Sequence, residues 1–151
     1  MTQDNDDSPR HYCFGCGVRN AEGLRIAFEV DGTKVTGRFS PRQAHQGFPG
    51  IAHGGISAAA MDEAMGWAMY AVGAWAVTAR MEVKYRGPLP LEQEVLITAE
   101  VTRTRGRRLE AEAKIQTLSG EVLAEAHGLF LRMPEDRTAE LNAIFLGDPS
   151  A

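Results

Sequence analysis

The strongest constraint on this chain is one apolar stretch between Gly54 and about Val72. Alanine, methionine, tryptophan and isoleucine dominate it, it contains no proline, and Asp62 and Glu63 are its only charged residues. These properties predict a helix, and a helix that is apolar on nearly every face must be surrounded by protein. Because no other part of the sequence predicts a helix as clearly, we expect a sheet to curl around this one.

Segments of alternating apolar and polar residues supply that sheet. Two of them precede the helix, at 24–30 and 35–39, with an Asp31-Gly32-Thr33 turn between them. Four more follow it, at 79–85, 95–101, 109–115 and 122–132. Short turns at Gly106 and Gly120 predict that these four form an antiparallel meander. The expected fold class is α+β, with a long antiparallel sheet of about six strands wrapped around one central helix.

The flanking residues set the expected limits of the domain. Residues 1–10 are polar and are predicted to be a disordered tail. Residues 11–134 should form one domain, since a chain of 151 residues is long enough to bury a core. Residues 135–151 should form a C-terminal tail, with a short helix around Leu141, Ile144 and Phe145.

Charge and hydropathy exclude several classes of function. A net charge of −4 argues against a nucleic-acid partner, which favours a basic surface. No apolar run approaches the roughly 20 residues that span a membrane. The sequence MTQDNDDSPR at the N-terminus lacks the pattern of a signal peptide. We therefore expect a cytoplasmic protein without a membrane partner, in which Cys13 and Cys16 stay reduced.

Four motifs occur in an order that resembles one family. The run HGGISAAAMDEAMG (53–66) is similar to the signature of PaaI-like hotdog thioesterases of the 4-hydroxybenzoyl-CoA thioesterase superfamily. The N-terminal CFGCG…N…GL (13–24), the run HQGFPGIAHGG (45–55) and VKYRGPLPL (83–91) match a bacterial subgroup. The resemblance covers nearly all of the chain outside the two tails. It implies a hotdog fold, a hydrolase that acts on acyl-CoA, and an obligate homodimer, or a homotetramer built from such dimers.

Asp62 is the central candidate for catalysis. An unpaired carboxylate inside an apolar helix costs several kcal/mol. From the residues alone, a structural aspartate that an arginine or an amide satisfies is as well supported as a catalytic one. The resemblance favours catalysis, because this position supplies the family's carboxylate, which activates water or attacks the thioester carbonyl.

His53, Gly54 and Gly55 open the helix. Glycines there allow a ligand to approach the free N–H groups and the positive end of the dipole, which can stabilise an oxyanion. His53 is expected to orient the loop or touch the substrate. Gly54 and Asp62 lie eight positions apart, about 12 Å along a helix. One carbonyl cannot readily touch both in the same chain, so we expect each site to combine Gly54 or Gly55 of one subunit with Asp62 of another.

One position departs from the family pattern. Many PaaI-like enzymes have an asparagine six positions before the motif histidine, where this chain has Gly47. His45 and Gln46 are candidates to replace it, and Gln46 is preferred because its amide can donate and accept hydrogen bonds. Thr78, on the strand after the helix, could also position water, although β-propensity alone explains a threonine there.

Arginines surround the Gly106 turn. A run of arginines is usually a solvated turn, but arginine also binds phosphates well, and coenzyme A carries several. We expect this hairpin to bind the phosphates of the substrate's CoA through Arg103, Arg105, Arg107 and Arg108.

His11, Cys13 and Cys16 resemble half of a zinc site. A structural turn is the preferred interpretation, because no second pair of ligands is evident, and a redox disulfide lacks a thioredoxin-like context. We therefore expect no metal site. Nor do we expect a cofactor, since CoA is part of the substrate.

The expected reaction is hydrolysis of a small acyl-CoA or aryl-acyl-CoA to the free acid and CoA. A 2-enoyl-acyl hydratase or dehydratase is the alternative enzyme, since His53 and Asp62 could supply its histidine–carboxylate pair. A non-catalytic acyl-CoA-binding protein is the third possibility. Trp67, Met69 and Trp75 could line an acyl pocket, although such residues are more often part of the core.

Overall fold

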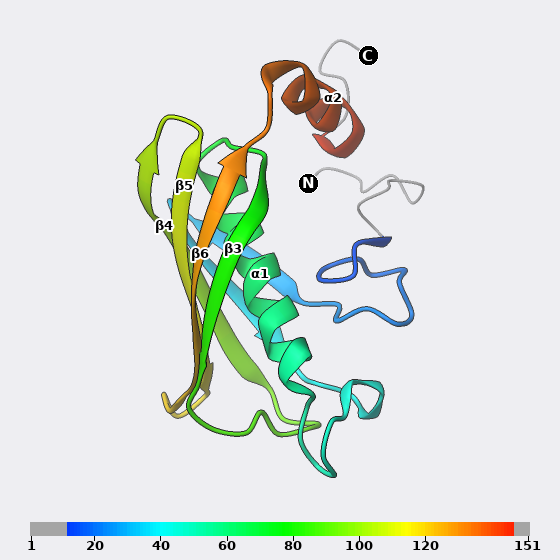
Figure 1. The fold of residues 1–151 in the computed structure, drawn as a ribbon. Coiled ribbons are helices and arrows are strands. Elements are labelled where there is room, and N and C mark those ends of the chain that lie inside the picture. The colour runs from blue at the N-terminus through cyan, green and yellow to red at the C-terminus, as the bar shows by residue number, and fades with distance from the viewer. Residues whose placement is uncertain (1–11, 147–151) are drawn as a thin grey trace.

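The computed structural model describes residues 12–146, which form one sheet and two α-helices (Figure 1). The sheet is antiparallel and has the strand order β1-β2-β4-β5-β6-β3. The strands are β1 (Ala27–Asp31), β2 (Lys34–Phe39), β3 (Ala76–Tyr85), β4 (Val95–Arg105), β5 (Arg108–Thr117) and β6 (Val122–Arg132). Helix α1 (Gly54–Ala71) packs against the sheet, which curls around it, and α2 (Glu135–Leu146) stands beyond one end of the sheet. The prediction of about six strands around one central helix is confirmed.

Helix α1 forms the centre of the core and contacts all six strands. Its sheet-facing side consists of small residues and methionines that are almost completely buried. Alanines let the helix lie close to the sheet, while the flexible methionines fill the remaining gaps. These residues are Ala60, Met61, Ala64, Met65, Ala68 and Met69. The other side of α1 is less well covered, and Gly66 and Tyr70 are exposed.

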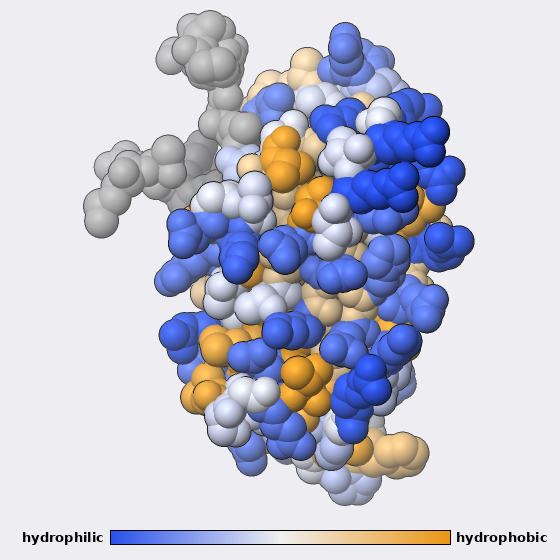
Figure 2. Space-filling view, turned by 90° about the vertical axis from the view of Figure 1, so that its left-hand side faces the viewer, coloured by the Kyte–Doolittle hydropathy of each residue, from blue (hydrophilic) through white to orange (hydrophobic). Residues whose placement is uncertain are grey.

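The alternation predicted at 95–101 and 109–115 is confirmed, whereas at 79–85 the predicted inward positions Ala79 and Tyr85 are exposed. On β4 and β5 the apolar positions Ile97, Leu109 and Ile115 are completely buried, whereas Glu100 and Lys114 are exposed. A strand of period two places every second side chain on the face that packs against α1. One face of the sheet therefore forms the core, and the other is largely hydrophilic, as the view onto β4 and β5 shows (Figure 2).

The predicted meander is correct only for β4, β5 and β6. Strand β3 pairs with β6 rather than with β4, and it forms one edge of the sheet. Short turns join β4 to β5 and β5 to β6, but residues 86–94, which include Gly87-Pro88-Leu89-Pro90, separate β3 from β4. This longer connection takes the chain across the sheet, so sequence neighbours are not spatial neighbours here.

The first strand begins later than predicted. Leu24 and Ile26 are buried in the core, but β1 begins at Ala27. Between them Arg25 has a φ of 54°, a left-handed conformation that interrupts an extended strand. The alternating pattern at 24–30 therefore predicted correctly that Leu24 and Ile26 are buried, but it did not predict where the strand begins.

The helix predicted near the C-terminus is longer than expected and packs on the domain. The indole N–H of Trp75 donates to Asn142 Oδ1 at 2.6 Å, and the Trp75 and Phe145 rings lie 5.5 Å apart. Leu141 is buried as well. The predicted tail at residues 1–10 lies outside the described residues. Neither helix within 12–146 has the length and apolarity needed to cross a bilayer.

Candidate active site

Asp62 lies in the middle of α1 and faces the edge strand β3. The hydroxyl of Thr78 donates to Asp62 Oδ1 at 2.6 Å, so the structure brings these two predicted site residues together. Asp62 is half-buried and Thr78 is exposed. Because a hydroxyl hydrogen bond leaves other lone pairs of the carboxylate unoccupied, Asp62 can still accept a proton or approach an electrophile.

At the N-terminus of α1, only one of the two glycine N–H groups that the sequence suggested is free of an acceptor in the described part of the chain. His53 is the N-cap residue, and its Nδ1 accepts the N–H of Gly55 at 2.9 Å. The N–H of Ile56 donates to the His53 carbonyl at 2.9 Å. Within residues 12–146, no acceptor takes the N–H of Gly54, which is exposed. Gly54 is therefore the amide most available to an oxyanion, and the role of His53 seen here is to cap the helix.

Tyr85 is a further candidate that the sequence did not single out. Its hydroxyl donates to the Gly54 carbonyl at 2.7 Å and joins the end of β3 to the first turn of α1. The tyrosine is exposed, ends the segment predicted as a strand at 79–85 and also lies within the VKYRGPLPL motif (83–91). No sequence signal connects Tyr85 with Gly54, since the two are 31 positions apart.

The two halves of the candidate site lie at opposite ends of β3. Thr78 marks the Asp62 half and Tyr85 marks the Gly54 half, seven positions along the strand. Eight positions along α1 separate Gly54 from Asp62, a rise of about 12 Å. Two hollows in the described part of the chain, of about 840 and 430 Å³, include none of these residues. A single chain thus does not gather both halves around one carbonyl.

The loop before α1 leaves no room for a side chain at position 47. A Cβ on Gly47 would lie 2.9 Å from His53 Cα, too close for a side chain to be accommodated without a shift. Gln46 Oε1 accepts the N–H of Gly50 at 3.3 Å within its own loop. His45 is buried, and its Nδ1 accepts the N–H of Arg42 at 2.9 Å; burial lowers its pKa. Neither His45 nor Gln46 forms a hydrogen bond with Asp62.

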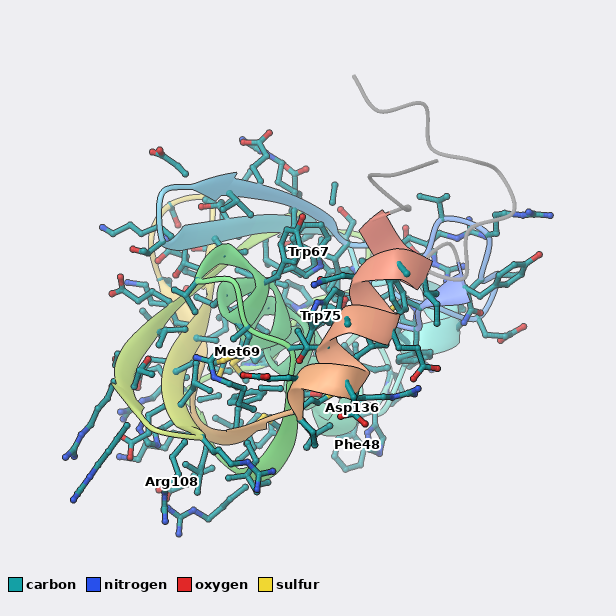
Figure 3. The ribbon with its side chains drawn as sticks, turned by 90° about the horizontal axis from the view of Figure 1, so that it is seen from above. Phe48, Trp67, Met69, Trp75, Arg108 and Asp136 are labelled. Atoms are coloured by element: carbon teal, nitrogen blue, oxygen red, sulfur yellow. The ribbon has the colours of Figure 1, made fainter. Side chains whose placement is uncertain are left out.

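The arginine hairpin does not gather all four predicted residues. Arg103, Arg105 and Arg108, together with Glu110, line the hollow of about 430 Å³. Arg107 instead donates to the Arg132 carbonyl at 3.3 and 3.4 Å. Arg108 and Glu110 flank the buried Leu109 on β5, so they lie on the sheet face away from α1. Figure 3 shows Arg108 on the outside of the sheet.

The aromatic residues near the end of α1 form a packed cluster. Trp67 stacks on Phe28 with ring centroids 5.4 Å apart, and Tyr70 packs edge-on against both Trp67 and Trp75. Trp75 lies beside α2 (Figure 3). Met69 is almost completely buried against the sheet. In this chain Met69 and Trp75 therefore serve the core and the docking of α2.

Glu63, the second charge of α1, faces a different neighbour from Asp62. Cys13 Sγ lies 3.4 Å from Glu63 Oε1. Hydrogen bonding from Cys16, with help from the backbone amides of Cys16 and Gly15, lowers the pKa of Cys13 to about 5. The Cys13 hydrogen bond and burial raise the pKa of Cys16, and burial raises the pKa of Glu63 to about 7. Of all described residues, only these three form a group with the spacing of metal ligands.

Comparison with known proteins gives consistent results. The family described as the thioesterase superfamily matches residues 49–124. The acyl-coenzyme A thioesterase THEM4 of Mus musculus is 31% identical over 121 residues, which are 77% of this chain and 52% of that protein. The chain therefore spans about half the length of this curated relative.

Solved structures share the fold. A thioesterase superfamily protein of 29% identity superposes with a TM-score of 0.69 over 72% of this chain and 57% of the other. The Escherichia coli PaaI protein from the phenylacetic acid degradation operon gives a TM-score of 0.69 at 18% identity, over 74% and 81% of the two chains. At that identity the likeness shows the hotdog fold alone.

Proposed function

The chain belongs to the thioesterase superfamily, and on that premise we propose that it hydrolyses the thioester of a small acyl-CoA or aryl-acyl-CoA. The products of that reaction are the free acid and CoA. The observation that carries this proposal is Asp62, a half-buried carboxylate that is held by Thr78 in a helix with only one other charged residue. The match to an acyl-coenzyme A thioesterase over 77% of the chain supports the same substrate class.

The chemistry divides between the two halves of the site. Asp62 either takes a proton from a water that attacks the carbonyl carbon or attacks that carbon itself. The N–H of Gly54 and the positive end of the α1 dipole stabilise the negative charge that develops on the carbonyl oxygen. The C–S bond then breaks, and its electron pair leaves with the thiolate of CoA. Where water has attacked, the acid is released at this point. Where Asp62 has attacked, a mixed anhydride forms between the acyl group and Asp62, and water then hydrolyses it to the free acid and the restored carboxylate. Thr78 orients the carboxylate throughout.

The active site is shared between two copies of the chain. Strand β3 is an edge of the sheet with exposed residues, and such an edge favours pairing with another strand. A partner whose β3 runs antiparallel brings its Tyr85 end towards the Thr78 end of the first copy. The Gly54 amide of one subunit then approaches Asp62 of the other. A homodimer follows from this arrangement, and a tetramer of such dimers and a cytoplasmic location stay predictions.

Thiol release distinguishes the candidate functions. A panel of acyl-CoA and aryl-acyl-CoA substrates is incubated with the purified chain, and free CoA is measured with a thiol reagent. We expect turnover that saturates with substrate. In parallel, loss of the enoyl absorbance of a 2-enoyl-CoA reports hydration. Hydration without thiol release would support the hydratase alternative, and binding without either reaction would support a non-catalytic role.

The arginine hairpin is proposed to bind the CoA phosphates through Arg103, Arg105 and Arg108. Three cations around one hollow support this role, although Glu110 offsets part of their charge. The hollow lies on the sheet face away from α1, so the nucleotide must reach it over the end of the sheet at the β4–β5 turn. Arginine suits such a site because its guanidinium pairs with phosphate oxygens in a fixed geometry.

Replacing Arg105 and Arg108 with alanine should raise the KM for acyl-CoA roughly threefold to tenfold, since exposed ion pairs each contribute up to about 1 kcal/mol. A short thioester that lacks the nucleotide should be affected much less, and added salt should mimic the double variant. Arg38→Ala, which removes an exposed arginine paired with Glu94, is the matched control. Equal losses on both substrates would contradict phosphate binding at the hairpin.

A further inference from the structure

Two cysteines and a carboxylate meet where the N-terminal turn crosses α1. The Sγ atoms of Cys13 and Cys16 and a carboxylate oxygen of Glu63 all lie within 4.8 Å of one another. Fifty positions separate Cys13 from Glu63, so the fold creates this group and no local motif contains it. All three side chains are half-buried.

The backbone of the turn is fitted closely to Glu63. A Cβ on Gly15 would come within 2.6 Å of Glu63 Oε2, so only glycine allows the turn to lie this near the carboxylate. The N–H groups of Leu24 and Ile26 donate to the carbonyls of Phe14 and Gly15 at 2.7 and 3.0 Å. Leu24 and Ile26 are themselves buried in the core. The two thiols are therefore held against α1 by a fixed backbone.

The distance between Cys13 and Glu63 matches that between two ligands of a tetrahedral zinc ion. Zinc lies about 2.3 Å from a thiolate sulfur and about 2.0–2.2 Å from a carboxylate oxygen. At the tetrahedral angle these bond lengths place sulfur and oxygen about 3.5 Å apart. Cys13 Sγ and Glu63 Oε1 are 3.4 Å apart. The same distance suits a thiol that donates to a carboxylate, so binding of the ion requires little movement of this pair.

The charges of the group also favour a cation. If all three groups ionised, Cys13, Cys16 and Glu63 would place three negative charges in one half-buried location, where their mutual repulsion is strong. A divalent cation offsets most of that charge. Two thiolates select a soft or borderline metal over Mg²⁺ or Ca²⁺, and zinc commonly combines sulfur with carboxylate ligands.

We propose that Cys13, Cys16 and Glu63 bind one Zn²⁺ ion, which fastens the N-terminal turn to α1. The fourth tetrahedral position is left to water. The role is structural, because Asp62 faces Thr78 and is not one of the ligands. This inference does not depend on the proposed hydrolysis.

Metal analysis of the whole chain, purified under reducing conditions, tests the proposal. Elemental mass spectrometry should find about one zinc per chain. Replacing zinc with Co²⁺ should give an intense near-ultraviolet sulfur-to-cobalt band together with the visible bands of a tetrahedral ion. Removing the metal with a chelator should lower the melting temperature, and added Zn²⁺ should restore it, because an ion that binds only the folded chain stabilises it.

Variants identify the ligands. Cys13→Ser and Glu63→Gln should each weaken zinc binding by more than about tenfold, the smallest effect expected for a group at a metal centre. Asp62→Asn is the matched control: it makes the same change from carboxylate to amide one position earlier and should retain zinc. A wild-type chain without zinc and without the cobalt band would overturn the proposal. So would a Cys13–Cys16 disulfide under reducing conditions, or unchanged zinc binding in both ligand variants.

Discussion

The Asp62→Asn variant is expected to hydrolyse acyl-CoA at least about a hundredfold more slowly than the wild type, a loss of about 2.7 kcal/mol of transition-state stabilisation. The asparagine amide keeps the size of the side chain and can still accept the hydrogen bond from Thr78. It can neither take a proton from water at neutral pH nor attack a carbonyl as a carboxylate does. The loss should therefore fall on kcat, with a small change in KM.

The measurement is thiol release at a series of substrate concentrations, with circular dichroism and a thermal melt to show that the variant is folded. Asp31→Asn is the control, because Asp31 is exposed at the β1–β2 turn and the substitution makes the same chemical change away from α1. A folded Asp62→Asn chain with near-normal kcat would contradict a catalytic role for Asp62.

Much of the fold could be predicted from the sequence because the buried faces of helices and strands require apolar residues at regular spacings. The apolar run at 54–72 predicted α1 to within a residue, and the segment at 122–132 matches β6. Which strands are neighbours could not be predicted in the same way. Alternation shows which face of a strand is buried, but it does not show which strand lies beside it. The place of β3 beside β6 therefore emerged only from the structure.

The candidate site was predictable to a similar extent. Asp62 was conspicuous because it is charged inside an apolar helix, and Thr78 was a candidate on the next strand. The hydrogen bonds that give these residues their geometry join positions far apart, and sequence patterns do not record them. Tyr85 on Gly54 and Glu63 on Cys13 are examples. Glu63 was visible as the other charge of α1, but nothing in its local sequence connects it with the cysteines.

The role of the helix N-terminus can be tested by a substitution that removes one backbone N–H group. Gly54→Pro deletes the N–H proposed to hold the oxyanion, and proline is well tolerated at the first helical position. His53 already has the extended conformation that proline requires of the preceding residue, with φ −58° and ψ 141°. An added Cβ would meet Tyr85 Oη at 3.5 Å, an ordinary contact. Gly54→Ala adds that Cβ and keeps the N–H, so it is the matched control.

Gly54→Pro should lower turnover by about 10²- to 10³-fold relative to Gly54→Ala, the usual effect of losing one oxyanion donor. Alone, this result would show that the Gly54 amide is needed for turnover, but not whether it acts with Asp62 of its own subunit or of the partner. Mixing the Gly54→Pro and Asp62→Asn variants answers that question. A heterodimer of Gly54→Pro and Asp62→Asn chains has one site with both defects and one site with neither, provided that each site combines residues of two subunits.

The most direct test is therefore the activity of the two inactive variants after they are unfolded together and refolded. Random pairing makes about half of the dimers heterodimeric, and each of these has one intact site of two. Native mass spectrometry establishes that heterodimers are present. A shared site predicts recovery of about a quarter of wild-type turnover. Heterodimers whose turnover stays at the level of the separate variants would contradict it.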